Sequence, residues 1–390
     1  MQLTDEEEQI AAGERGPVLQ KALRALVRYG EVFGAKRLVP CGSGHVVVAT
    51  GALLFVEYHR MLREVAAEGL AFRVPTTANP RAYDPEAASP ILRLSYPRQR
   101  AFDALLERLG CAPAFTCTPY LAGNAPTSGE VVAWAETNAV AYANSVLAAR
   151  TNPTPALVDM LCALLGRAPD YGLLGDEGRL ADCRVIVRPG AGDDPGLLGL
   201  TLGRKIRGHV VWIEGIDYGP DELKEMSATA NCSGLLPLLH VAGVTPEARA
   251  IGERLVRRGA AEAEVTRDDV AAVRAKLSAG PERPTAVVIG CPHLSAAQLT
   301  SVASLLAGRR ARVPLSIAAC DAVWRSLDGT REYEALVASG AALWRNCALA
   351  FHSVPRLGKR RVLTNSAKLA YHIHARYAPT EQCIEAALGR

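Results

Sequence analysis

The 390-residue sequence lacks several features that would assign it at once to a simple class of protein. No two cysteines form a Cys-x-x-Cys pair, which excludes compact zinc fingers and thioredoxin-like redox motifs. No apolar run approaches the ~18 residues that a membrane-spanning helix needs. The net charge is only +4, from 44 basic and 40 acidic residues, so neither nucleic acid nor an anionic membrane is an expected partner.

The sequence also lacks a basic leader, because its first residues, MQLTDEEEQ, are acidic and unlike a secretory or mitochondrial targeting segment. Its cysteines lack the dense, regular spacing of a small secreted disulfide scaffold, so we expect reduced thiols in a cytoplasmic protein. Any metal site must therefore be assembled from distant parts of the chain. The ten cysteines are Cys41, Cys111, Cys117, Cys162, Cys183, Cys232, Cys291, Cys320, Cys347 and Cys383.

The sequence does contain an alternation of apolar strands and amphipathic helices. This alternation predicts an α/β protein with largely parallel sheets flanked by helices. The length predicts several lobes, which we place at 1–185, 186–280 and 281–390, with the loop 188–196 as a lobe boundary or an insertion. Strands are predicted at 36–39, 45–48, 71–75, 209–215, 235–241 and 285–290. Helices are predicted from Thr4, up to Ala67, at 97–109 and 131–150, and from Pro220 and Thr245.

Three cysteines each close an apolar run where a strand should give way to a loop. Cys117 ends APAFTC, Cys291 ends TAVVIGC and Cys347 ends AALWRNC. Ligands collect at the carboxyl ends of parallel strands, and three thiolates can anchor an iron–sulfur cluster that keeps one iron open. Cys320 ends VPLSIAAC in the same setting, and packing in the core explains a single cysteine equally well.

Two loops carry further candidate groups. VPTTANP, residues 74–80, places Asn79 and Pro80 in a rigid polar loop that can hold a carboxylate or simply form a turn. GCPHLS, residues 290–295, places His293 beside Cys291, either as a proton donor or as a loop histidine bonded to the backbone. Ser295 is positioned to cap the helix that follows.

Two charged residues stand in segments made largely of small residues. Glu136 is the one carboxylate of WAETNAVAYANS, and it is either a buried acid–base group or an exposed side chain. Lys368, in TNSAK, falls in the first turn of a predicted helix, where a cation opposes the helix dipole. A nearby anion would account for a lysine at that position, although a solvent-facing lysine would also be tolerated.

Five long motifs together resemble the aconitase X family, in its large, catalytic portion. The resemblance runs nearly end to end and is carried by VPTTANP, TCTPYLAGNAPTSGEVVAWAETNAVAYANSVLAART, HVAGVTPEA, IGCPHLS and LTNSAK. It implies an aconitase-like, multi-lobed fold. It also implies an iron–sulfur-dependent hydro-lyase that removes water from a small hydroxy acid such as cis-3-hydroxy-L-proline or mevalonate 5-phosphate.

The resemblance further implies roles for individual residues. Cys117, Cys291 and Cys347 match the cysteines that bind the cluster, of 4Fe-4S, 3Fe-4S or 2Fe-2S type, and Cys320 is left out. Glu136, Lys368 and His293 become candidates for proton handling and for holding the substrate anion. The expected substrate contacts are Thr50 in the loop after His45, Asn79, Pro80, Glu136, Thr137 and Lys368.

Three departures from the family pattern stand out. Val47 to Thr50 replace a small, serine- and glycine-rich loop; residues 151–156, TNPTPA, lack the usual arginine, acid and glycines; and Thr137 stands where serine is usual. We expect these changes to cluster around the substrate pocket, so that the substrate could differ from both known ones.

The family also needs a small swivelling domain of about 130 residues. Because the chain ends where the large portion ends, we expect a separate small subunit, with the active site between the two. Two other functions stay open at this stage. One is an acyl transferase with Cys117 as nucleophile and His293 as base. The other is a non-catalytic subunit that has lost its cluster.

Overall fold

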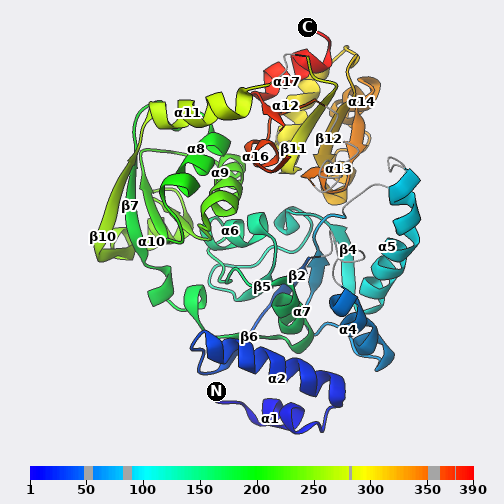
Figure 1. The fold of residues 1–390 in the computed structure, drawn as a ribbon, viewed down its shortest axis with the longest axis vertical. Coiled ribbons are helices and arrows are strands. Elements are labelled where there is room, and N and C mark those ends of the chain that lie inside the picture. The colour runs from blue at the N-terminus through cyan, green and yellow to red at the C-terminus, as the bar shows by residue number, and fades with distance from the viewer. Residues whose placement is uncertain (48–55, 82–89, 281–282, 350–360, 374) are drawn as a thin grey trace.

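The computed structural model describes residues 1–47, 56–81, 90–280, 283–349, 361–373 and 375–390. Its strands form three larger sheets, and every pairing within them is parallel. Helices flank each sheet (Figure 1). The predicted α/β class with largely parallel sheets is therefore confirmed.

The first sheet has the strand order β4-β3-β2-β5. Its strands are β2 (Ser43–Val46), β3 (Thr76–Ala78), β4 (Cys111–Phe115) and β5 (Val132–Trp134). Its helices are α4 (Val56–Ala67), α5 (Pro90–Arg108), α6 (Thr137–Ser145) and α7 (Ala156–Leu165). The N-terminal helices α1 (Asp5–Ala12) and α2 (Pro17–Val32) lie at the bottom of Figure 1, beside a two-stranded antiparallel sheet. That small sheet pairs β1 (Leu38–Pro40) with β6 (Arg167–Pro169).

The second sheet has the order β10-β7-β8-β9 and lies at the left of Figure 1. Its strands are β7 (Ala181–Val187), β8 (Val211–Glu214), β9 (Leu239–Val241) and β10 (Val256–Val265). Its helices are α8 (Pro195–Lys205), α9 (Pro220–Gly234), α10 (Pro246–Ile251) and α11 (Arg267–Ser278). The proposed lobe boundary after residue 185 falls inside β7, so a boundary before Ala181 would keep that strand whole; the lobe limits stay a prediction.

The third sheet has the order β13-β12-β11-β14-β15 and lies at the top of Figure 1, with the C-terminus. Its strands are β11 (Ala286–Leu294), β12 (Leu315–Ala319), β13 (Ala342–Trp344), β14 (Val362–Thr364) and β15 (Arg376–Tyr377). Its helices are α12 (Ala296–Leu306), α13 (Asp321–Ser326), α14 (Arg331–Ala338), α16 (Ala367–Ile373) and α17 (Thr380–Ala387). None of the helices in the described ranges is long and apolar enough to cross a membrane.

Two predicted elements are wrong. Residues 71–75 are not a strand, because the strand begins only at Thr76. The Phe72 amide instead donates a hydrogen bond to the Leu109 carbonyl, which is not part of a strand pairing. Residues 131–150 are not one helix, because Val132–Trp134 pairs with β2 before the helix begins at Thr137. The alanine content favours a helix locally, but pairing with a neighbouring strand overrides that propensity.

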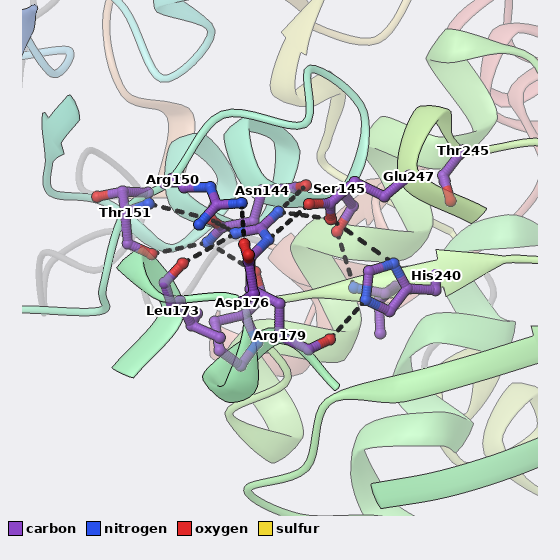
Figure 2. A network of polar contacts seen from close by, with 12 residues as sticks. Asn144, Ser145, Arg150, Thr151, Leu173, Asp176, Arg179, His240, Thr245 and Glu247 are labelled. Atoms are coloured by element: carbon purple, nitrogen blue, oxygen red, sulfur yellow. Dashed lines mark hydrogen bonds and ion pairs between the residues drawn. The ribbon is translucent and has the colours of Figure 1, made fainter. Parts of the chain in front are cut away.

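A buried arginine joins the first and second sheets (Figure 2). Arg179 is 1% exposed and donates two hydrogen bonds to the Glu247 carboxylate, at 2.8 and 2.7 Å. It also donates to the side chain and the backbone carbonyl of Asn144 in α6, each at 3.1 Å. On the other side, the His240 ring donates from Nε2 to the Arg179 carbonyl at 2.8 Å. This network fixes α6, and therefore the residues at its N-terminus, relative to the second sheet.

Candidate active site

Cys117 lies where the first sheet meets the third. It follows β4, it is buried, and its Sγ accepts a hydrogen bond from the His293 amide at 3.2 Å. Its carbonyl accepts from Asn138 Nδ2, at the start of α6, at 2.7 Å. Burial raises the pKa of the Cys117 thiol well above its usual value, and the charges of Glu136 and Cys291 add to this rise.

Cys291 and Cys347 come from neighbouring parts of the third sheet. The register of β11 against β12 shifts between Ile289 and Leu294, so Cys291 stands outside the regular ladder. Burial raises the pKa of Cys291 to about 12; Lys368 opposes the rise, while Cys347 and Glu136 increase it. Cys291 is therefore within electrostatic reach of both other predicted cluster ligands, since Cys117 also responds to it.

An ion pair between Lys368 and Glu136 lies beside these thiols. Lys368 Nζ, in the first turn of α16, is 3.1 Å from Glu136 Oε1 although the residues are 232 positions apart. Lys368 is 5% exposed. Burial lowers its pKa, but Glu136 and the thiols of Cys291, Cys232 and Cys117 outweigh burial and raise the pKa above its usual value. The ammonium is therefore charged and surrounded by the predicted site residues.

Glu136 is the N-cap of α6 and is held on both carboxylate oxygens. Oε2 accepts from the amides of Asn138 and Ala139, at 3.0 and 3.2 Å, while Oε1 accepts from Lys368. Its φ of 84° lies in the left-handed region, which is uncommon for a residue other than glycine. Such strain is often found at functional sites, and here it aims the carboxylate at Lys368.

The other expected substrate contacts follow β3 or begin α6, except for Thr50. Asn79 and Pro80 are buried directly after β3, and the next residue, Arg81, accepts a hydrogen bond from the Cys347 amide at 2.8 Å. Thr137 is partly buried, and its carbonyl accepts from Asn231 Nδ2 in α9 at 2.9 Å. Thr50 lies outside the described residues.

Thiolates are the ligands that hold iron–sulfur clusters, so the donor chemistry of the three cysteines is compatible with such a group. Among the described residues, no group of three or more His, Cys, Asp or Glu side chains is arranged around a metal ion. Cys320, by contrast, is 2% exposed within the core of the third sheet, as the packing interpretation expects.

His293 has no ring nitrogen directed at Cys117. Its Nδ1 is 3.1 Å from Thr116 Oγ1 and its Nε2 is 3.2 Å from the Asn346 carbonyl, so it is the backbone amide that reaches the thiol. Burial lowers the pKa of the ring to about 4. A Cys117 nucleophile activated by a His293 base needs contact between ring and sulfur and a lowered thiol pKa, and both conditions fail here.

Sequence reasoning missed two residues of α9 that face this centre. Burial raises the pKa of Cys232 to about 11, while the charge of Lys368 lowers this pKa and that of Glu136 raises it. Burial raises the pKa of Glu225 to about 7, with Lys224 opposing the rise, and Glu225 in turn acts on Cys291. Both residues lie within α9, Cys232 in its last turn, and neither closes a strand, so no local signal marked them.

One departure from the family pattern, segment 151–156, lies against the C-terminal part of α6, where the Thr151 amide donates to Asn144 at 3.1 Å. Residues Thr151, Asn152 and Thr154 line a small cavity together with the buried Asp159 and Tyr171. In the part of the chain that the structure describes, the hydrogen bonds of Asn152 go to Tyr171 and Leu173 and not to a candidate site residue. The expectation that segment 151–156 borders the substrate pocket stays a prediction.

Comparison with known proteins gives a consistent match along the chain. Family models described as the first, second and third domains of aconitase X match residues 1–177, 182–275 and 284–389. A cis-3-hydroxy-L-proline dehydratase of Pseudomonas aeruginosa is 36% identical, over 97% of this chain and 69% of that protein. A phosphomevalonate dehydratase large subunit of Thermococcus kodakarensis is 33% identical, over 96% of this chain and 95% of that protein.

A solved structure extends this similarity to the fold. The crystal structure of Thermococcus kodakaraensis aconitase X, in its holo-form, superposes with a TM-score of 0.89 at 31% identity. The match covers 99% of this chain and 100% of that chain. Three domain models, two curated relatives and one solved structure thus agree.

Proposed function

This chain belongs to the aconitase X family, and on that basis we propose that it is the large subunit of a hydro-lyase acting on a small hydroxy carboxylic acid. The observation that carries the proposal is the buried Lys368–Glu136 pair beside Cys117 and Cys291. A cation, a carboxylate and thiols from the first and third sheets meet there. Dehydration of a hydroxy acid needs an anion site, a proton acceptor and a group that assists the leaving hydroxyl.

Lys368 binds the substrate carboxylate in this proposal. An ammonium has three N–H donors, and Glu136 takes one of them at 3.1 Å. A bound substrate carboxylate can accept from the other two, because a buried cation attracts an anion far more strongly than an exposed one. The low exposure of Lys368 therefore suits a site that binds an anion and excludes water.

Glu136 accepts the proton next to the substrate carboxylate. Oε1 faces Lys368, and the two amides on Oε2 fix the carboxylate plane at the helix N-terminus. The C–H proton moves to Glu136 Oε1, the electron pair of the C–H bond forms the new double bond as the C–O bond breaks, and the proton that Glu136 has accepted passes to the departing hydroxyl, which leaves as water. Glu136 and Lys368 thus act on the same side of one substrate.

Cys117, Cys291 and Cys347 would hold an iron–sulfur cluster in this site. When bound, such a cluster supplies a Lewis-acidic iron that assists the departure of the hydroxyl. Lys368 stabilises the thiolate forms of Cys117 and Cys291, since its charge lowers the pKa of both against the effect of burial. The chain thus carries a cation suited to an anionic cluster as well as to an anionic substrate.

The remaining parts of the proposal concern partner, substrate and compartment. The Thermococcus relative is named a large subunit, which supports a separate small subunit of the swivelling type here. The named relatives act on cis-3-hydroxy-L-proline and on phosphomevalonate; a small hydroxy acid of this kind is the proposed substrate. The scattered cysteines support a reducing, cytoplasmic location.

Anaerobic purification followed by an iron count and an absorption spectrum tests the proposal. We expect bound iron and a visible chromophore in the wild-type chain, and the loss of both after replacing Cys117, Cys291 or Cys347 with serine. Cys320→Ser is the matched control, because Cys320 also ends a strand but lies in the core of the third sheet. A colourless protein that lacks iron would favour the cluster-free subunit instead.

Turnover with the small subunit tests the ion pair. Lys368→Met should lower kcat/KM about 10²–10³-fold, as for other charges that stabilise a developing anion. Lys205→Met, which removes a more exposed lysine paired with Asp269, is the control and should keep wild-type turnover. Full activity of Lys368→Met on every hydroxy acid tested would contradict the assigned role of Lys368.

A further inference from the structure

His293 contacts the segments of all three predicted cluster ligands. It lies two residues after Cys291, its amide donates to Cys117 Sγ at 3.2 Å, and its Nε2 lies 3.2 Å from the carbonyl of Asn346. Asn346 directly precedes Cys347. One side chain therefore connects the ends of β4, β11 and β13, which come from two different sheets.

The hydrogen-bond partners determine the protonation of the ring. A backbone carbonyl can only accept, so Nε2 carries the proton and donates it to Asn346. With the Nε2 proton donated to a carbonyl, Nδ1 can accept from the hydroxyl beside it. The Thr116 hydroxyl donates to Nδ1 at 3.1 Å, and Thr116 Oγ1 itself accepts from the Thr118 amide at 2.9 Å. Both ring nitrogens are thus engaged by the protein, which suits a positioning role and leaves none for a proton transfer to substrate.

A buried lysine in α9, a helix of the second sheet, supports the end of β11 that carries Cys291 and His293. Lys224 in α9 is 1% exposed and donates to the His293 carbonyl at 3.2 Å, to Asp221 at 3.0 Å and to Gln298 at 2.5 Å. Ser295, which caps α12, donates to the other oxygen of Asp221 at 2.5 Å. The end of β11, which carries Cys291 and His293, is therefore held by α9 of the second sheet as well as by the first sheet.

We propose that His293 is a positioning residue, which, supported by Lys224, holds the segments of Cys117, Cys291 and Cys347 in register for the cluster. We call Thr116, His293, Asn346 and Lys224 the cysteine junction. The inference rests on the proposed function, because that function assigns the three cysteines to a cluster. The side chains that orient metal ligands commonly contribute about 10–100-fold in metal affinity.

The test compares His293→Phe with the wild-type chain in two measurements. The first is iron retained per chain after anaerobic reconstitution and titration with a chelator, and we expect affinity to fall about 10–100-fold. The second is the alkylation rate of Cys117 and Cys347 in the metal-free protein, which should rise because the segments are no longer held together. His293→Gln keeps a hydrogen-bond donor near the Asn346 carbonyl. It should therefore restore part of the iron affinity and part of the protection of Cys117 and Cys347 from alkylation.

His240→Phe is the matched control. His240 is 1% exposed and also donates Nε2 to a backbone carbonyl, that of Arg179 at 2.8 Å, but it lies in the Arg179 network (Figure 2). It should lower the thermal midpoint without changing iron affinity or alkylation. Thr116→Val, which preserves shape but removes the hydroxyl that donates to Nδ1 and accepts from the Thr118 amide, serves if His293→Phe does not fold, with a smaller change in the same direction.

The outcomes separate this inference from the proposed function. A wild-type chain without iron contradicts the cluster, and the alkylation rates then still decide whether the cysteine junction exists. A wild-type chain that binds iron, with His293→Phe and Thr116→Val matching it in both measurements, overturns the positioning role alone.

Discussion

At the scale of the residue, burial changes the pKa of single side chains from the value that is usual for their residue type. His45, the third residue of β2, is 0% exposed, and its Nδ1 lies 2.8 Å from Thr77 Oγ1. Burial lowers the pKa of His45 to about 3. The ring therefore stays neutral in the folded protein at a pH where an unfolded chain would take up a proton.

This depressed pKa predicts a loss of stability in acid. Because the unfolded state binds the proton below its pKa of about 6.5, stability should fall as the pH drops from 6.5 toward 3. His45 alone should cost about 2 kcal/mol between pH 7 and pH 5. Urea midpoints at the two pH values, for wild type and His45→Gln, measure this. Equal losses in both proteins would contradict a neutral, buried His45.

At the scale of the element, two glycines allow α8 and α9 to pack closely. A Cβ on Gly203 of α8 would lie 2.1 Å from Ser233 Oγ and 2.7 Å from the Gly234 amide of α9. The helix α9 carries Lys224, Glu225 and Cys232, all of which act on the candidate site or on the cysteine junction. The close approach of α8 thus helps to set the position of α9.

Gly203→Ala should force the two helices apart and lower stability by about 1–3 kcal/mol, as overpacked interfaces do. The denaturation midpoint of the metal-free chain measures the effect. Gly175→Ala is the control, because the nearest atom to its added Cβ would be 3.9 Å away. A Gly203→Ala midpoint equal to that of Gly175→Ala would show that the interface is looser than described.

At the scale of the whole molecule, buried polar groups join the three sheets, in addition to the apolar contacts that α16 and β15 make with the core of the second sheet. The Arg179 network connects the first and second sheets, and the cysteine junction connects the first, second and third. The Lys368–Glu136 pair then lies between elements of the third and first sheets. The geometry of the candidate site therefore depends on how the three sheets are held together.

Arg179→Leu should destabilise the chain by about 3–5 kcal/mol, since it leaves the Glu247 carboxylate buried without its partner. Calorimetry of the purified chain measures this through the thermal midpoint. Arg257→Leu, which removes an exposed pair with Glu177, should change stability by less than about 1 kcal/mol. Similar shifts for both variants would mean that the Arg179 network does not join the lobes.

Local features of this protein followed from the sequence alone. The α/β alternation, the helix start at Thr4, the capping of the helix after Ser295, and Lys368 in the first turn of its helix are all confirmed. Caps and periodicity depend on residues three or four positions apart, so they can be read directly from the chain. The aconitase X resemblance, carried by long motifs, is confirmed as well.

Only the tertiary structure decided which of these residues meet. Strand pairing turned residues 132–134 from predicted helix into β5, and packing brought Lys368 to Glu136 across 232 positions. It also bonded both nitrogens of His293 within the protein, one of them to a backbone carbonyl, where the sequence had left open either a proton donor or a loop histidine bonded to the backbone. Contacts between segments that are far apart in the sequence depend on how whole sheets pack against one another. No local pattern of residues determines which of these segments meet.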